Sequence, residues 1–429
     1  MSPRRALILT YGSRGDVEPF LALAKGLQGA GLDVLFATSE RFRDFVTEHG
    51  IAFFPLSDAS LAAIETQDGK TMLEGGRGLT RRIAAGIRLA RRSGPINDAL
   101  MRQCWEAARG FPPDVIVFHA KLFAAPHIAE KLNVPAFLGA LQPMYVPTRA
   151  FPAMGLPHLP FPGYNRLTYA LVQKSIGAFR GRINRFRQDD LDLPPVRHGR
   201  DVLAPPGTGP LRVLHAYSPH LIPRPDDWPA TAFITGSWRL DKARDYTPPE
   251  ALRSFLERGA PPVFVGFGSM TSVDGAALGR LVTCALHKAG QRGVVAKGWA
   301  NLKIAADETI ISIPPAPYDW LFPQMTAVVH HGGAGTTLEA FHAGVPSVIC
   351  PFFGDQPGWA SLAADLGVAT PPIPRRKLTE NRLAAAIREA VTSERLRDNA
   401  RQLGTRLRVE DGVAKAVEII TGEHADGHH

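Results

Sequence analysis

Cysteines and long apolar runs are scarce in this sequence. Its 429 residues include only three cysteines, Cys104, Cys284 and Cys350, which lie far apart. So sparse and odd a set argues against a disulfide framework and a zinc site, and we expect small buried thiols. No segment approaches the roughly 20 apolar residues of a membrane span, and the apolar run that starts at Ala6 is too short for a signal peptide. The sequence therefore predicts a cytoplasmic protein.

Positive charge exceeds negative charge in the chain, whose formal net charge is +9. Much of the excess lies in residues 77–92 and 180–200. A basic protein can bind nucleic acid, anionic lipid or an anionic small ligand. Neither stretch carries an RNA-binding motif or a zinc finger, so we expect no nucleic-acid partner. The amphipathic segment 77–92 is either a surface helix with a solvated basic face, which we favour, or a flap touching membrane lipid, so membrane contact is peripheral at most.

Both halves of the chain alternate short apolar strands with helical patterns. This alternation predicts an α/β fold with parallel sheets and crossover helices, and two Rossmann-like domains are the simplest arrangement. The expected strands are 6–10, 33–37, 51–54, 114–118, 135–138 and 211–216, then 262–267, 293–296, 310–313, 327–330 and 347–350. Ligands of such sheets bind at the carboxyl ends of the strands, so we expect the chemistry in a cleft where two carboxyl edges face each other.

Proline content and helical patterns set the expected boundaries. Residues 1–218 are expected to form one domain and residues 241–404 a second. Four prolines between 219 and 229 suit a linker, which we place at 219–240. One helix is expected over about 380–403. A further helix in 405–429 is expected to pack back on the amino-terminal domain.

The most specific segment is a glycine-rich turn, His-His-Gly-Gly-Ala-Gly-Thr-Thr-Leu-Glu, at residues 330–339. It follows an apolar strand and precedes a helix. Glycines let the backbone approach a ligand closely, and the unpaired N–H groups of a helix N-terminus suit a diphosphate. His331 and Thr336 can add hydrogen bonds, and Glu339 can accept from ribose hydroxyls. A plain strand-to-helix turn with a buried histidine is the alternative.

A second polar pair, Asp355 and Gln356, follows the strand at 347–350. A carboxylate beside an amide can grip vicinal hydroxyls of a sugar. The alternative is an Asx-type turn before Pro357.

These segments together resemble the signature of glycosyltransferase family 1. The run from Ile313 through Gln356 is similar to the family's donor site, most of all in the branch of sterol glucosyltransferases and antibiotic-biosynthesis glycosyltransferases. The loop from Gly12 to Pro19, Gly-Ser-Arg-Gly-Asp-Val-Glu-Pro, is similar to the opening loop of that branch. The middle of the chain, roughly 60–210, carries little that matches. The resemblance implies the GT-B fold, with two domains facing across a cleft, and inversion at the anomeric carbon.

The resemblance also assigns donor contacts. It places His331, Gly333, Gly335 and Thr336 at the diphosphate, Glu339 at the ribose, and Asp355 and Gln356 at the sugar. Ser269 resembles a second diphosphate contact, and Ser13, Arg14 and Gly15 of the opening loop are assigned to the donor. Ile313 to Ala316 falls where plant members hold uracil with a tryptophan. This chain has Ile-Pro-Pro-Ala there, which leaves the choice between uridine and thymidine open.

Asp16 and His119 are the predicted catalytic residues. Each follows a strand, so each is expected at a carboxyl edge. In the branch with the Gly-Ser-Arg-Gly-Asp loop, the aspartate is the expected base that takes the acceptor proton. Asp16 as a plain cap of a helix beginning near Val17 is the alternative. His119 orients or replaces Asp16, or merely lines the cleft, and Arg14 steers the donor or pairs with Asp16.

The predicted activity is that of an inverting hexosyltransferase. It moves a hexose, glucose in the first instance, from a UDP-sugar to a hydroxyl of a lipophilic acceptor such as a sterol or a macrolide. Apolar side chains of the 143–164 loop, Met144, Tyr145 and Phe151 among them, are expected to form the acceptor wall. No cofactor and no metal are expected, and Asp190-Leu191-Asp192 is not assigned to one. A nucleotide-sugar epimerase and a non-catalytic helper protein are the competing functions.

Overall fold

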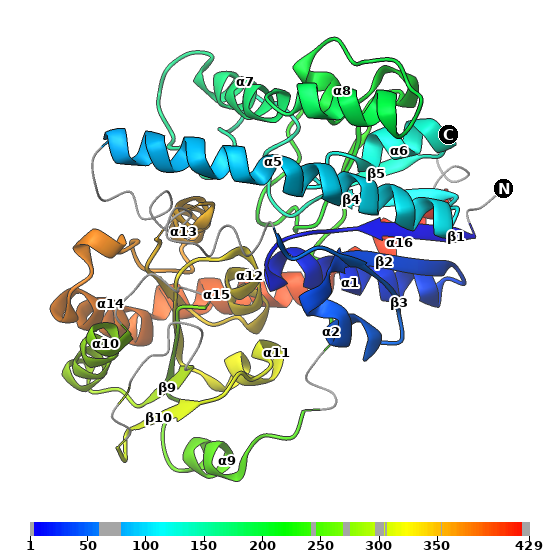
Figure 1. The fold of residues 1–429 in the computed structure, drawn as a ribbon. Helices are drawn as coiled ribbons and strands as arrows, with labels where there is room; N and C mark the ends of the chain where they lie inside the picture. Colours follow the sequence, from blue (N-terminus) through cyan, green and yellow to red (C-terminus); the bar gives the residue numbers. More distant parts are fainter. Residues whose placement is uncertain are drawn as a thin grey trace. The chain divides into compact units, whose positions relative to one another are not determined.

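The computed structural model describes residues 4–59, 79–241, 246–268, 275–296, 304, 307–352 and 354–422, the side chains of 79–93 excepted. The chain divides into two compact units (Figure 1). Unit 1 comprises Met1–Leu240 with Asp411–His429, and unit 2 comprises Asp241–Glu410. Each unit holds its own parallel sheet, as the alternating pattern predicts.

Unit 1 is built on seven parallel strands in the order β3-β2-β1-β4-β5-β6-β7. After β1 the chain adds strands outward on one side, then returns to place β4 on the other side of β1. This reversal is a topological switch point, where open α/β sheets bind their ligands. The strands are β1 (Arg5–Leu9), β2 (Asp33–Ser39), β3 (Ala52–Leu56), β4 (Val115–His119), β5 (Ala136–Ala140), β6 (Arg212–His215) and β7 (Ala232–Ile234).

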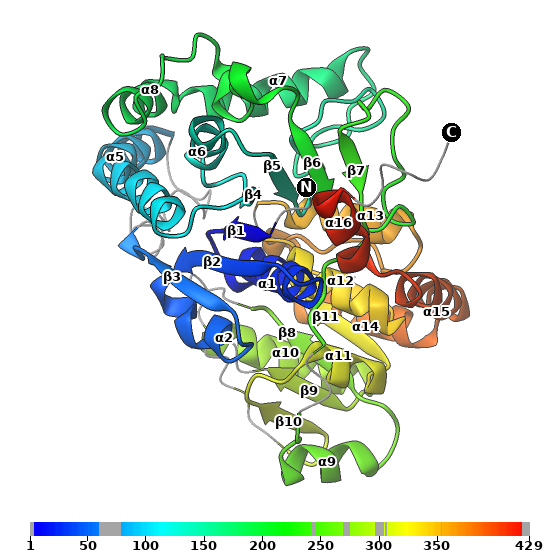
Figure 2. The same ribbon diagram turned by 90° about the vertical axis from the view of Figure 1, so that its right-hand side faces the viewer.

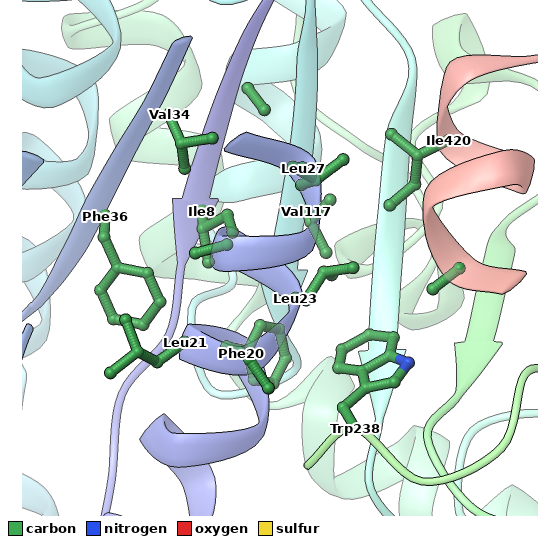
Figure 3. Close-up of a cluster of buried hydrophobic side chains, with 14 of the residues drawn as sticks. Ile8, Phe20, Leu21, Leu23, Leu27, Val34, Phe36, Val117, Trp238 and Ile420 are labelled. Atoms are coloured by element: carbon green, nitrogen blue, oxygen red, sulfur yellow. The ribbon is translucent and has the colours of Figure 1, made fainter. Parts of the chain in front are cut away.

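Helix α1 (Arg14–Gly29) covers this sheet with one apolar face. Phe20, Leu23 and Leu27 recur at helical spacing and are fully buried against strand residues such as Ile8 (Figure 3). The chain turns after Ala30 at Gly31, whose φ of +87° favours glycine. The other helices of unit 1 are α2 (Arg43–Thr47), α5 (Leu79–Gly110), α6 (Ala125–Leu132), α7 (Tyr164–Gly177), α8 (Arg180–Asp189) and α16 (Gly412–Thr421).

The segment 219–240, for which the proline pattern predicts a linker, contributes to the core of unit 1. It supplies β7, which pairs with β6, and Trp238, which packs edge-on against Phe20 at 5.4 Å between ring centroids. Helix α16 closes the same core after the chain has passed through unit 2. Ile420 lies in the cluster with Leu27 (Figure 3). Gly26 leaves room for Val413, because a Cβ on Gly26 would lie 2.3 Å from Val413 Cγ1.

The basic stretch near residue 187 has a structural reason. Arg187 on α8 is 2% exposed, and its guanidinium pairs with Glu130 of α6. It also donates to Nδ1 of the buried His127 at 2.8 Å, while Nε2 of His127 lies 3.1 Å from the Val202 carbonyl. Burial and the nearby Arg187 charge lower the pKa of His127 to about 3. Arg187 therefore anchors α8 and the following turn to α6.

Unit 2 repeats the switch-point topology with five parallel strands in the order β10-β9-β8-β11-β12. The strands are β8 (Val263–Gly266), β9 (Gly293–Ala296), β10 (Ile310–Ile313), β11 (Ala327–His330) and β12 (Ser347–Ile349). The helices are α9 (Glu250–Glu257), α10 (Gly275–Ala289), α11 (Tyr318–Leu321), α12 (Ala334–Ala343), α13 (Gln356–Asp365), α14 (Glu380–Thr392) and α15 (Glu394–Arg408).

Two sequence expectations need correction or limits here. The single helix expected over 380–403 is two helices, because the Ser393 side chain caps α15 by accepting from the N–H of Leu396. Residues 79–92 are helical, as part of α5. Their side chains are not among those that the structure describes, so the choice between a solvated basic face and a lipid-touching flap stays a prediction.

The described part of the chain also bears on the expectations about cysteines and membrane spans. Cys104 and Cys350 are buried, whereas Cys284 is half-buried, and all three are free. Burial raises the pKa of Cys104 and Cys350 to about 12. No helix among these residues is both long and apolar enough to traverse a bilayer.

Candidate active site

The switch point of unit 1 brings Asp16 and His119 together. β1 and β4 are neighbours in register, Leu9 opposite Phe118, so the segments that follow them leave the sheet side by side. The side chains of the two residues approach to 3.5 Å between Asp16 Oδ1 and His119 Nε2. The predicted catalytic pair is therefore one cluster.

Asp16 is held by the first turn of α1. The helix begins at Arg14 with Ser13 as its N-cap, so the expectation of a helix beginning near Val17 is wrong by one turn. Asp16 reaches back to accept from the Ser13 backbone N–H at 2.7 Å and from its hydroxyl at 2.9 Å. Gly12 sits directly against the carboxylate, since a Cβ there would lie 2.2 Å from Asp16 Oδ2. The aspartate thus caps the helix with one oxygen and presents the other to His119.

Lys121 is the third member of this cluster, and the sequence analysis missed it. Its ammonium group lies 2.9 Å from Asp16 Oδ1, and the side chain is 51% exposed. The available signal was its place two residues beyond His119, at the same strand end. Alternate residues after a strand tend to share a side, so His119 and Lys121 reach the same carboxylate.

The hydrogen bonds of His119 define its role. Its Nδ1 accepts the backbone N–H of Lys121 at 3.3 Å, which leaves the proton of the neutral ring on Nε2, toward Asp16. The ring is 5% exposed and packs edge-on against Phe20, with 5.8 Å between the ring centroids. Burial lowers the pKa of His119 to about 4, against the opposing effect of Asp16. The only lone pair of the neutral ring that could take up a proton, on Nδ1, already accepts the Lys121 N–H. His119 is therefore better suited to orienting Asp16 than to accepting a proton.

The electrostatics of Asp16 keep it ionised. Burial raises its pKa, but the positive charge of Lys121, the adjacent His119 ring and the hydrogen bonds from Lys121 and Ser13 together hold it below the usual range. The same negative charge, after burial, raises the pKa of Tyr145, which places this phenol near the carboxylate. Of the three residues predicted for the acceptor wall, Tyr145 is the one whose pKa is raised by the charge of Asp16.

Of the other residues predicted near Asp16, some are exposed and some pack against neighbouring side chains. Arg14 pairs with Glu18 at 2.9 Å and stacks over Phe45 instead of pairing with Asp16. Gly15 has open space beside it, since a Cβ there would have only the Ser13 hydroxyl within 4 Å, at 3.8 Å. Phe151 packs edge-on against Trp228 at 6.3 Å, and Met144 is half-buried.

A small apolar cavity of about 20 Å³ adjoins Lys121 between α5 and α8. At this size it holds at most one water. Its apolar lining comes mostly from Leu100, Met101, Leu122, Phe123, Phe179 and Ile183. The sequence analysis did not foresee this lining.

The switch point of unit 2 lies between β8 and β11, where His330 pairs with Gly266. The two strands are followed by Gly268 and His331, which are in contact: a Cβ on Gly268 would lie 2.9 Å from His331 Cε1. Burial lowers the pKa of His331 to about 4, so the ring is neutral. Its Nδ1 is buried and has no hydrogen-bond partner within the part of the chain that the structure describes. The glycine-rich turn thus holds a neutral imidazole with one nitrogen that has no hydrogen-bond partner among the described residues.

The glycine-rich turn opens directly into α12. Gly332 has a φ of +86°, and a Cβ there would lie 2.7 Å from Ile349 Cγ2, so a side chain is excluded. Gly333 is the N-cap and offers no side-chain oxygen, which leaves the first N–H groups of α12 without a side-chain cap. Gly335 is exposed with open space around it, and Thr336 and Glu339 are half-buried on the same helix. This is the geometry of an anion-binding helix N-terminus.

The Asp355–Gln356 pair adjoins this turn. β11 and β12 are neighbours, and the backbone of Gln356 would lie 3.1 Å from a Cβ on Gly332. Both side chains also serve the local fold. Gln356 Oε1 accepts the Phe352 N–H at 2.8 Å, and Asp355 accepts the Trp359 indole N–H at 3.0 Å. The predicted sugar pair and the predicted phosphate turn therefore share one sheet edge.

The remaining predicted donor residues are less informative. Ile313 ends β10 and is 3% exposed within a core cluster, and Ala316 packs against that cluster. Ser269 lies outside the described residues.

Comparison with known proteins now adds to this geometry. Residues 6–151 match the family model described as Glycosyltransferase family 28 N-terminal domain, and residues 307–416 match Erythromycin biosynthesis protein CIII-like, C-terminal domain. The sterol 3-beta-glucosyltransferase of Arabidopsis thaliana is 34% identical over 96% of this chain and 67% of its own length. The chain belongs to the glycosyltransferase family that includes this enzyme.

A second curated relative and a solved structure are also similar to this chain. The sterol 3-beta-glucosyltransferase of Emericella nidulans is 36% identical over 97% of the chain, which spans only 30% of that relative's length. The solved structure of glycosyltransferase VinC in complex with DTDP has a TM-score of 0.68 at 18% identity, covering 99% of this chain and 100% of VinC. This likeness shows that the fold is GT-B, as the resemblance implies.

Proposed function

We propose that the chain transfers a hexose, glucose in the first instance, from UDP to a hydroxyl of a lipophilic acceptor such as a sterol, with inversion. One observation carries the proposal: the two switch points hold complementary chemistries. Unit 1 presents an ionised carboxylate, Asp16, and unit 2 presents a helix N-terminus with a neutral imidazole. Glycosyl transfer needs both, a proton acceptor for the hydroxyl and a site for the departing diphosphate.

The reaction assigns one role to each group. The acceptor oxygen forms a bond to the anomeric carbon while the bond from that carbon to the diphosphate oxygen breaks. The hydroxyl proton passes to Asp16, and the leaving diphosphate gathers charge beside α12, where N–H groups and His331 stabilise it. His119 and Lys121 position the carboxylate. Glu339 is assigned to the ribose, and Asp355 and Gln356 to the sugar hydroxyls.

The acceptor class rests on apolar residues near the base. Tyr145 lies close enough to Asp16 for its charge to raise the tyrosine pKa, and apolar side chains such as Leu122 and Phe123 lie beside Lys121. Such surroundings suit a greasy alcohol better than a sugar or a peptide. The Arabidopsis and Emericella relatives carry sterol 3-beta-glucosyltransferase as their names, which makes a sterol 3-hydroxyl the first acceptor to test.

A matched pair of acceptors tests the proposal. The purified chain is incubated with UDP-glucose or TDP-glucose and either a 3β-hydroxysterol or the corresponding 3-ketosterol, and products are read by mass spectrometry. We expect a hexosylated sterol with UDP-glucose, none from the ketone, and at least ~10²-fold less from the Asp16→Asn variant. A product with TDP-glucose alone would overturn the donor assignment. Release of free glucose or an epimer with no acceptor product would overturn the transferase assignment.

A further inference from the structure

Exposed large apolar side chains gather in one short segment of unit 1. Of the six such residues found in the part of the chain that the structure describes, five lie between 156 and 171. They are Leu156 (37% exposed), Leu159 (42%), Phe161 (65%), Leu167 (56%) and Leu171 (53%). We call this set the 156–171 surface. Leu167 and Leu171 are one turn apart on α7, so they share a face, and Phe161 stands just before the helix.

Helix α7 is fixed to unit 1 by the residues on its inner side. α7 buries just Thr168 and Tyr169 among its 14 residues. The Thr168 hydroxyl accepts the N–H of Ala153 at 2.9 Å, and Gly177 lies against Gly199, where a Cβ would be 2.9 Å from the next backbone. α7 lies at the edge of unit 1 in both views (Figures 1 and 2). An ordered helix therefore holds its apolar outer face toward solvent.

The stretch of sequence that carries this surface has charged residues of one sign only. The chain has 40 acidic residues, yet none occurs between Glu130 and Asp189, whereas eight lysines and arginines do. Arg166 and Lys174 flank Leu167 and Leu171 on α7 itself, and both are exposed. The nearest carboxylate partner is Asp227, 3.7 Å from Arg166. Apolar side chains framed by basic ones are the pattern of helices that lie in the interface of an anionic membrane.

We propose that the 156–171 surface docks on an anionic phospholipid bilayer. Phe161, Leu167 and Leu171 enter the boundary between headgroups and acyl chains, and Arg166 and Lys174 contact the phosphates. A second copy of this chain would bring the same positive charge against this surface, and like charges facing each other oppose association. An anionic bilayer matches both the apolar and the basic side chains, because its acyl chains lie directly beneath its negatively charged headgroups. This proposal does not depend on the transferase activity.

Vesicle binding tests the apolar part of the proposal. The full chain is sedimented with phosphatidylcholine vesicles that contain or lack phosphatidylglycerol. The variant is Phe161→Gln, Leu167→Gln and Leu171→Gln together, since glutamine matches leucine in helix propensity. The matched control is Val409→Gln, because Val409 is 82% exposed but belongs to unit 2. We expect the parent and the control to bind vesicles with phosphatidylglycerol, and the triple variant to bind at least about tenfold more weakly.

The charge part is tested by Lys174→Gln, for which we expect about fivefold weaker binding to the anionic vesicles and no change on neutral ones. Equal melting temperatures show that the variants fold. Equal vesicle binding by the parent and the triple variant would overturn the proposal. So would binding that ignores phosphatidylglycerol content. If the parent fails to bind vesicles but sediments as a dimer that the triple variant abolishes, the occupant is a second copy and the membrane assignment is wrong.

Discussion

The two switch points share a topology and differ in chemistry. In both sheets the chain adds strands on one side and then returns beside its first strand, between β1 and β4 in unit 1 and between β8 and β11 in unit 2. At the first, Asp16 and Lys121 form a charged pair within 2.9 Å. At the second, glycines, N–H groups and a neutral histidine line the turn. In both units the sheet topology fixes where the switch point lies, whereas the loop residues determine its chemistry.

The largest effect is expected from removing the negative charge of Asp16 in unit 1. Asp16→Asn keeps the shape of the side chain but cannot take a proton. We expect kcat to fall by at least ~10²-fold, the usual contribution of a general base, while UDP affinity by calorimetry stays unchanged. Asp44→Asn, on the exposed first turn of α2, is the control and should leave kcat alone. Near-normal turnover in Asp16→Asn would remove Asp16 as the base and leave it as a helix cap.

A smaller effect is expected from weakening the proposed diphosphate site in unit 2. His331→Ala removes the imidazole whose Nδ1 has no hydrogen-bond partner among the described residues. A hydrogen bond to a charged group such as a diphosphate contributes about 1.5–3 kcal/mol. We expect UDP affinity to drop by about 10- to 100-fold in titration calorimetry. His287→Ala is the control, since His287 is exposed and pairs with Asp307. Unchanged UDP affinity in His331→Ala would contradict the diphosphate assignment.

The smallest expected effect is a change in the pH dependence of activity when Lys121 is replaced. Lys121 lowers the pKa of Asp16 by its charge and its hydrogen bond. A base works only when deprotonated, so activity is lost as pH falls through its pKa. Lys121→Met should therefore move the acid limb of kcat/KM to higher pH, whereas Lys121→Arg should leave it in place. An acid limb that is identical in all three proteins would mean that Lys121 does not tune Asp16.

Much of this architecture follows from the sequence because its signals are local. Strands such as Ala6–Leu9 and Val115–Phe118 are short apolar runs, and parallel pairing then puts Asp16 and His119 at one edge. What the sequence did not reveal depends on contacts between distant segments. Lys121 reads as a surface lysine until β4 is placed beside β1. The split at Ser393 depends on one side-chain cap, and β7 is three residues long, too short for a pattern to show.

The acceptor residues show the limit most clearly. The aromatic loop at 143–164 predicts an apolar wall, but its residues turn out to serve different ends. Tyr145 lies near Asp16, Phe151 packs on Trp228, and Phe161 is exposed. An apolar side chain does not say what it will contact, because burial in a core, a pocket or a membrane uses the same residue types.

Helix α16 has a consequence for how the protein is made. Its Ala416, Val417 and Ile420 belong to the core of unit 1, yet they leave the ribosome only after all of unit 2. Nascent unit 1 must therefore wait, with a stripe of α1 uncovered, while residues 241–410 are synthesised. Unit 2 is continuous in the chain and can reach its native contacts first, so the domain encoded second is free to be the one that finishes folding first.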